Sequence, residues 1–138
     1  MKFFLDENLP QGLIGHLSSI FRAHEFVGVK ELNTKGMEDV ELFGFVAERG
    51  CHVFVTGDMR QLIEDHERAA CRKAGLHWVG VHHVQSTGYH VIAGPASTLV
   101  HALPFALVHW ENATEPRFFK LKKSERNYTK VFESYGKL

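Results

Sequence analysis

The opening of the chain, residues 1–8 (MKFFLDEN), constrains the fold more than any other stretch. Phe3, Phe4 and Leu5 form a continuous apolar run, which is typical of a central strand covered on both faces. Asp6 follows at the carboxyl end of this run. Because ligands of open α/β sheets bind at the carboxyl ends of the strands, Asp6 is the first candidate site residue.

The rest of the chain alternates between apolar strands and amphipathic helices. The predicted strands are 3–5, 25–29, 52–56 and 78–81, and the predicted helices are about 9–21, 38–49, 61–74 and 95–108. We expect Asn8 to cap the first helix. The buried side of the second helix is expected to be formed by Val40, Phe43 and Ala47, flanked by Leu42 and Val46. This alternation indicates βαβ units, a mostly parallel sheet and helices on both of its faces.

The last part of the chain has a different composition. Residues 117–122 and 128–132 are candidate strands in which apolar and basic residues are mixed. Residues 117–138 contain seven Lys or Arg against two acids, a net charge of +5, in a chain of 138 residues that is neutral overall. We expect a single domain over 1–138, with a core of about 1–112 and a basic, β-rich extension of about 113–138. This extension forms either an appended hairpin or part of the sheet.

Several classes of protein are disfavoured by the sequence. Cys51 and Cys71 have no zinc-type spacing and are expected to be buried and reduced. His82 and His83, with His90, also lack such spacing, although the end of a strand leaves a phosphate contact open for the first two. We find no signal peptide and no apolar run near the roughly 20 residues of a membrane span. The expected location is therefore cytoplasmic, without a membrane partner.

Acidic side chains follow two predicted strands and begin one predicted helix. Asp6 ends the first strand, Asp39 opens the second helix and Asp58 ends the strand 52–56. All three can converge at one edge of the sheet, where mutual repulsion calls for a cation. Oxygen-rich clusters suit Mg²⁺ or Mn²⁺, which activate water for attack on a phosphodiester. Taken alone, Asp39 would most often be a helix N-terminal acid, and Asp58 would most often be a turn or cap residue.

The basic end of the chain has two interpretations. Its cations alternate with Phe118, Phe119 and Tyr128, so they can neutralise RNA phosphates while the aromatic rings stack on unpaired bases. The cations are Arg117, Lys120, Lys122, Lys123, Arg126 and Lys130. In the other interpretation the aromatic residues belong to the core and the charges are simply solvated.

Three motifs carry a resemblance to a known family. The opening KFFLDENLP at 2–10 resembles the start of the PIN-like nuclease family, in particular a small branch with a Leu-Asp-Glu-Asn-Leu-Pro signature. GMEDVEL at 36–42 is similar to that branch's Gly-x-x-Asp-x-Glu-hydrophobic segment, and VFVTGD at 53–58 to its strand ending in Thr-x-Asp. The resemblance covers about residues 1–83.

This resemblance implies a three-layer α/β/α fold and metal-dependent RNA cleavage, commonly by the toxin of a VapC-type toxin–antitoxin pair. It implies an RNA substrate, a cognate antitoxin protein, a homodimer and a Mg²⁺ or Mn²⁺ cofactor. The implied metal-binding and catalytic residues are Asp6, Asp39 and Asp58, with Thr56 orienting the site. We add Glu7, Asn8 and Glu41 as supporting residues and Arg60 as an RNA contact.

One position departs from the family pattern. Arg60 stands where the family often has a fourth acid, and Glu7, Glu64 or Asp65 are candidates to replace it. This departure keeps open an alternative, a catalytically weakened module that binds RNA or a protein partner without turnover. A receiver-like or phosphatase-like domain also clusters acids at strand ends. It ranks lower, because receiver domains place paired acids and a later Lys in an order not seen here.

Overall fold

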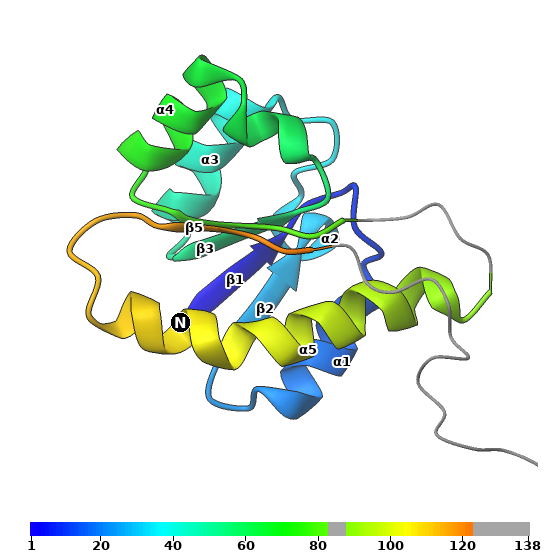
Figure 1. Ribbon diagram of the computed structural model, residues 1–138. Helices are drawn as coiled ribbons and strands as arrows, with labels where there is room; N and C mark the ends of the chain where they lie inside the picture. The colour runs from blue at the N-terminus through cyan, green and yellow to red at the C-terminus, as the bar shows by residue number, and fades with distance from the viewer. Residues whose placement is uncertain (83–87, 123–138) are drawn as a thin grey trace, which may run out of the picture.

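The computed structural model describes residues 1–82 and 88–122 and contains a five-stranded parallel sheet in the order β2-β1-β3-β4-β5 (Figure 1). The strands are β1 Lys2–Leu5, β2 Glu25–Gly28, β3 Val53–Thr56, β4 His77–Gly80 and β5 Phe118–Lys120. The helices are α1 Leu13–Ile20, α2 Val29–Leu32, α3 Asp39–Glu48, α4 Asp65–Lys73 and α5 His90–Glu111, with a 3₁₀ turn η1 at Met59–Leu62.

Helices cover both faces of this sheet, as predicted. Figure 1 shows α3 and α4 on one face and α1 and α5 on the other. The β1 strand lies between β2 and β3 and is buried along its apolar run. The three-layer α/β/α architecture with a parallel sheet is therefore confirmed.

The alternation of side chains along β1 creates two cores. Phe3 and Leu5 pack with α1 and α5, whereas Phe4 packs on the opposite face with Phe54 and Phe43. Each of these five side chains is fully buried. A strand whose side chains pack into the cores on both faces of the sheet needs apolar residues at every position. This explains the unbroken apolar run at the start of the chain.

The first helix begins later than predicted, and Asn8 is not its cap. The N-cap position of α1 is Gly12, four residues further along the chain. The side-chain amide of Asn8 instead donates to Asp6 and to Thr56, so it is committed to the loop after β1. Leu9 still reaches the core, because it is buried just before the helix begins.

The prediction for the buried side of α3 was partly wrong. Phe43 is buried, together with Leu42 and Val46, but half of Val40 is exposed to solvent. Phe45 and Ala47 are partly buried and pack against the same core. The beginning of the helix at Asp39 and its end before Gly50, which has the left-handed φ of 78°, agree with the sequence.

The third predicted helix is divided into η1 and α4. The carboxylate of Asp58 accepts a hydrogen bond from the backbone of Arg60 and thereby caps η1. Ile63 and Glu64 separate the two elements, and Ile63 is 70% exposed. Gln61 lies within η1, and its side chain is buried.

The chain after α4 completes the sheet. The short strand β5 pairs in parallel with β4, so residues 118–120 join the sheet, while the candidate strand 128–132 lies outside the described residues.

The helix α5 begins at His90, ahead of Pro95. By length and composition alone α5 is able to span a membrane, which the sequence analysis did not anticipate. In this structure one side of α5 packs on the sheet through Leu99, Leu103, Ala106 and Trp110.

The exposed and buried valines of α3 provide a test of its orientation. We expect Val46→Ala to lower the free energy of unfolding by about 2 kcal/mol, because two buried methyl groups are lost and a cavity remains. Val40→Ala should change it by less than about 0.5 kcal/mol, because that side chain is half exposed. Urea denaturation of both variants measures the difference, and equal losses would contradict the observed face of α3.

Candidate active site

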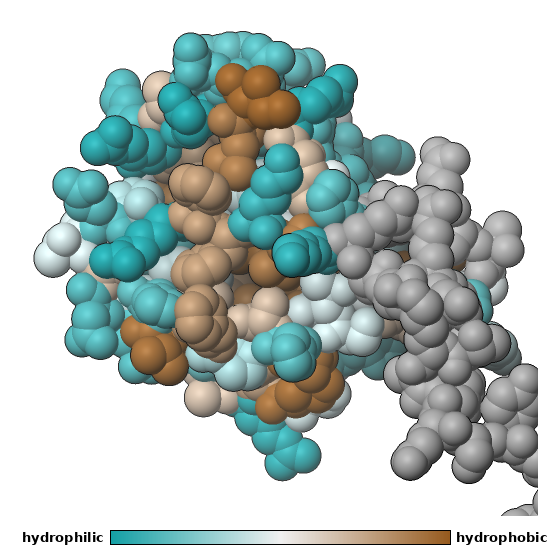
Figure 2. Space-filling model, viewed as in Figure 1, coloured by the Kyte–Doolittle hydropathy of each residue, from teal (hydrophilic) through white to brown (hydrophobic). Residues whose placement is uncertain are grey.

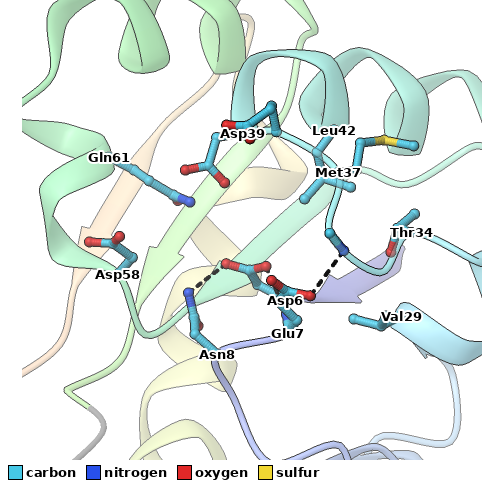
Figure 3. Close-up of a pocket in the computed structure, with 12 residues that line it drawn as sticks. Asp6, Glu7, Asn8, Val29, Thr34, Met37, Asp39, Leu42, Asp58 and Gln61 are labelled. Atoms are coloured by element: carbon cyan, nitrogen blue, oxygen red, sulfur yellow. Dashed lines mark hydrogen bonds between the residues drawn. The ribbon is translucent and has the colours of Figure 1, made fainter.

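A pocket of about 340 Å³ opens at the carboxyl ends of β1 and β3 (Figure 3). It brings together side chains from the loop after β1, the segment before α3, and η1. Its lining residues are Asp6, Glu7, Asn8, Val29, Thr34, Gly36, Met37, Glu38, Asp39, Leu42, Asp58 and Gln61. Asp6, Asp39 and Asp58 therefore line the same pocket, as the sequence analysis expected.

Asp6 is the most buried acid of the pocket, with 3% of its surface exposed. The hydroxyl of Thr56 donates to its Oδ2 at 2.7 Å, and the side-chain amide of Asn8 donates to the same atom at 2.7 Å. The backbone N–H of Glu7 donates to Oδ1, also at 2.7 Å. Three donors thus hold the carboxylate in one orientation at the junction of β1 and β3.

Thr56 and Asn8 extend this network to the next acid. The Thr56 hydroxyl also accepts the backbone N–H of Asp58 at 3.0 Å, and Asn8 Oδ1 accepts the backbone N–H of Gly57 at 2.6 Å. The loops that follow β1 and β3 are consequently tied together through side chains. A change at Thr56 would disturb both Asp6 and Asp58.

A glutamine supports the loop from the other side. Gln11 Nε2 donates to the carbonyl oxygens of Asp6 at 3.0 Å and Leu9 at 3.1 Å, and its Oε1 accepts the N–H of Val29 at 3.1 Å. The side chain packs so closely on Gly28 that a Cβ there would collide with it. Gln11 therefore links the ends of β1 and β2 and fixes the backbone that carries Asp6.

The carboxylates of Asp6 and Asp39 have pKa values above the usual range. Burial is the main cause for both, and the pKa of Asp6 rises further because Asp39 and Glu7 repel its charge. Hydrogen bonds from Thr56 to Asp6 and from Gln61 to Asp39 oppose this rise without cancelling it. Neither acid forms an ion pair within the part of the chain that the structure describes.

Asp58 is in a different electrostatic state. Arg60 donates to both of its carboxylate oxygens, from Nε at 3.1 Å and from Nη2 at 2.8 Å. This bidentate hydrogen bonding is the main reason that the pKa of Asp58 lies below its usual range. Arg60 thus neutralises the charge of Asp58.

The donor set of the pocket suits a hard divalent cation by its chemistry. Carboxylate oxygens are the ligands that Mg²⁺ and Mn²⁺ prefer, and the repulsion between Asp6 and Asp39 is relieved by a cation. Thr34 adds an observation from the pocket wall, because its buried hydroxyl oxygen has no hydrogen-bond partner among the described residues. Residues 1–82 and 88–122 nevertheless contain no group of three acids, histidines or cysteines already placed to hold one ion.

The other candidate residues lie at varying distances from this pocket. Glu7 lines it and accepts a hydrogen bond from the N–H of Gly36 at 3.3 Å. Glu41, Glu64 and Asp65 are exposed and do not line it. The cations Arg117, Lys120 and Lys122 are exposed on or beside β5, whereas Lys123 and Arg126, like His83, lie outside the described residues.

The sequence analysis did not identify two side chains at or near the site. Gln61 lines the pocket and bonds to Asp39, but no sequence pattern marks a glutamine that follows an acid by three residues. Glu67 has a raised pKa, first because of burial and then because Asp39 repels its charge. It lies on the first turn of α4 and does not itself line the pocket.

Comparison with known proteins identifies the family. A model of the PIN-like domain matches residues 1–82, which is more than half of the chain and includes every lining residue of the pocket. The comparison with curated proteins gave no significant match. The comparison with solved structures gave none either. PIN-like domains are generally nucleases, a class that commonly uses divalent metals. The matched segment establishes that the chain belongs to the PIN-like domain family.

Proposed function

We propose that this protein is a metal-dependent endoribonuclease that hydrolyses RNA phosphodiesters. One observation carries the proposal: the buried carboxylate of Asp6 and the partly buried carboxylate of Asp39 line a common pocket, and neither forms an ion pair among the described residues. Burying charge in this way is costly unless something neutralises it. A divalent ion neutralises such acids and supplies an activated water together with charge stabilisation for a phosphate.

We assign different roles to the residues of the pocket. Asp6 and Asp39 would hold Mg²⁺ or Mn²⁺, and Asp58 would join them once Arg60 releases it. Thr56 and Asn8 keep the Asp6 carboxylate oriented, so no rearrangement of that side chain is needed when a ligand binds. Gln61 lines the pocket beside Asp39 and lowers the pKa of that carboxyl. Glu7, which lines the pocket, adds negative charge and would raise the attraction for a cation.

The RNA would approach over the basic side of the molecule. Arg117, Lys120 and Lys122 are exposed and carry positive charge without an acidic residue between them in sequence. Arg60 is exposed above the pocket and has a guanidinium that fits a phosphate. Lys123 and Arg126 continue the same basic segment in the sequence.

The biological setting is also part of the proposal. The opening segment 2–10 resembles VapC-type toxins, so we infer a cytoplasmic toxin of a type II toxin–antitoxin pair. The cognate antitoxin would keep RNA from the pocket, and an arginine side chain from it would pair with the carboxylates. A homodimer is the assembly that the same resemblance implies.

A second function is favoured by the Arg60 contact. With Asp58 neutralised by a guanidinium, the pocket presents two available acids instead of three. A domain in this state would bind RNA or a protein partner without cleaving RNA. The two functions differ in whether cleavage appears when metal is added.

Substitution of the two pocket acids Asp6 and Asp39 tests the first function. We expect wild-type protein to cleave a mixed pool of structured and single-stranded RNA with Mg²⁺ or Mn²⁺. Asp6→Asn and Asp39→Asn should fall to the background seen with chelator, because each removes a ligand charge. Glu41→Gln is the matched control, an exposed acid on the first turn of α3 that does not line the pocket. Wild-type rates in both pocket variants would exclude this site.

Removing the guanidinium tests the role of Arg60. We expect Arg60→Gln to bind Mn²⁺ several-fold more tightly than wild type, because Asp58 becomes available and a competing positive charge is gone. Arg49→Gln is the control. Arg49 follows the end of α3, whereas Asp39 begins that helix, so this change should not alter Mn²⁺ binding. Isothermal titration measures both. Weaker binding in Arg60→Gln would show that the guanidinium supports the site rather than competing with metal.

The raised pKa of Asp39 predicts a pH dependence of stability without metal. A carboxyl whose pKa is raised by folding binds protons more readily in the native state, so ionising it as pH rises destabilises the fold. Wild type should therefore lose stability relative to Asp39→Asn as pH rises from acid to neutral, with the difference complete once pH exceeds the raised pKa. Urea denaturation in chelator measures this difference, and a constant value across pH would refute it.

A further inference from the structure

A second cavity lies between α4 and the edge strand β5. Its volume is about 330 Å³, within the range of small-ligand sites. Apolar side chains form much of its wall, and three arginines stand around it. The lining residues are Gln61, Leu62, Arg68, Cys71, Arg72, Leu76, Trp78, Glu115, Pro116, Arg117 and Phe118. We call this cavity, with Lys120 beside it, the α4–β5 groove.

The groove and the acid pocket share one wall. Gln61 lines both cavities, and its amide joins them, because Oε1 accepts the indole N–H of Trp78 at 3.1 Å while the side chain also bonds to Asp39. Gln61 is 2% exposed and Trp78 is 3% exposed, so this connection is fixed within the core. A ligand in the groove therefore lies one side chain away from the carboxylates.

The charge around the groove is predominantly positive. Arg68 pairs with Asp65 at 3.1 Å, and Arg72 approaches Glu115 at 3.9 Å, with all four side chains largely exposed. Arg117 forms no ion pair within the described residues. Exposed pairs of this kind are weak and exchange readily for a phosphate. The rim thus offers guanidinium groups to an anion.

The strand β5 adds an aromatic ring and an amine on one face. Phe119 turns toward α5 and packs against Trp110, so its neighbours Phe118 and Lys120 face the other side of the sheet. Phe118 is 62% exposed and lines the groove, opposite Trp78 on β4. Lys120 lies opposite Gly80, nearer the carboxyl ends of the strands where the acids are.

Figure 2 shows apolar side chains at the surface on this side of the molecule, bordered by hydrophilic ones. An exposed ring between cations is the arrangement that binds single-stranded nucleic acid, with the base stacked and the phosphates neutralised. A base enters such a cavity only when it is unpaired.

We propose that the α4–β5 groove binds one nucleotide of single-stranded RNA next to the bond that the acid pocket cleaves. The base packs on Phe118 and the apolar wall, while Arg117 and Arg72 contact its flanking phosphates. Lys120 guides the strand from the groove toward the acids. This assignment rests on the proposed nuclease function for the identity of the ligand.

The test uses paired variants and RNA binding without cleavage. Fluorescence anisotropy in chelator compares a labelled single strand with its duplex. We expect the single strand to bind more tightly, and Phe118→Ala to weaken it on the order of tenfold. Tyr89→Ala is the control, because Tyr89 is an exposed aromatic residue that lines neither the groove nor the acid pocket. It should bind RNA like wild type.

Salt dependence separates the roles of the ring and the cation. Arg117→Ala should weaken binding and reduce the slope of log affinity against log salt by about one, whereas Phe118→Ala should leave the slope unchanged. Arg22→Ala, a cation after α1, is the control for lost charge.

The outcomes distinguish this proposal from the proposed function. Metal-dependent cleavage with wild-type RNA binding in both Phe118→Ala and Arg117→Ala would overturn the groove and leave the nuclease intact. It would assign the cavity to another ligand, such as an acidic peptide. Weakened RNA binding in both variants, from a protein that cuts no RNA, would support the groove and reject the nuclease. Equal affinity for single strand and duplex would also overturn the groove.

Discussion

The structure depends on burying one carboxylate, that of Asp6, at the junction of two central strands. A buried charge must be surrounded by donors, and the chain supplies them from Thr56 on β3, the backbone of Glu7 and the amide of Asn8. These bonds draw the ends of β1 and β3 together and prevent the loop after β1 from entering the helix early. The conformation of the site and the packing of the sheet are therefore consequences of the same constraint.

Much of this arrangement was predictable from the sequence, because it follows from local patterns. The unbroken run at Phe3 to Leu5 predicts a strand buried on both faces, and acids after strands predict a common edge. Asn8 and Val40 were assigned incorrectly because tertiary contacts decide them. The Asn8 side-chain oxygen that a cap would need accepts the backbone N–H of Gly57, and Val40 lies on the solvent side of α3. The pairing of β5 with β4 depends on a crossover through α5, which no local signal specifies.

Charge balance along the sheet edge explains the unusual polar residues. Arg60 satisfies Asp58 but leaves Asp6 and Asp39 to repel each other across the pocket. Gln61, the next residue, is neutral and bonds to both Asp39 and Trp78, so it transmits the position of η1 to two cavities. The 3₁₀ turn η1 thereby places one side chain, Gln61, in the wall of both the acid pocket and the α4–β5 groove. Conventional helix geometry through residues 59–62 would separate these contacts.

The order of the elements in the chain has a consequence for synthesis. Every residue of the acid pocket lies within the first 61, and the family match ends at residue 82, yet Phe3 and Leu5 are covered on one face by residues 99–110 of α5. A nascent chain that has exposed only its N-terminal half carries all the acids but has a bare sheet. Because small domains fold cooperatively, we expect the pocket to assemble only after α5 has left the ribosome. A chain that terminates before α5 would lack the cover of one face of β1.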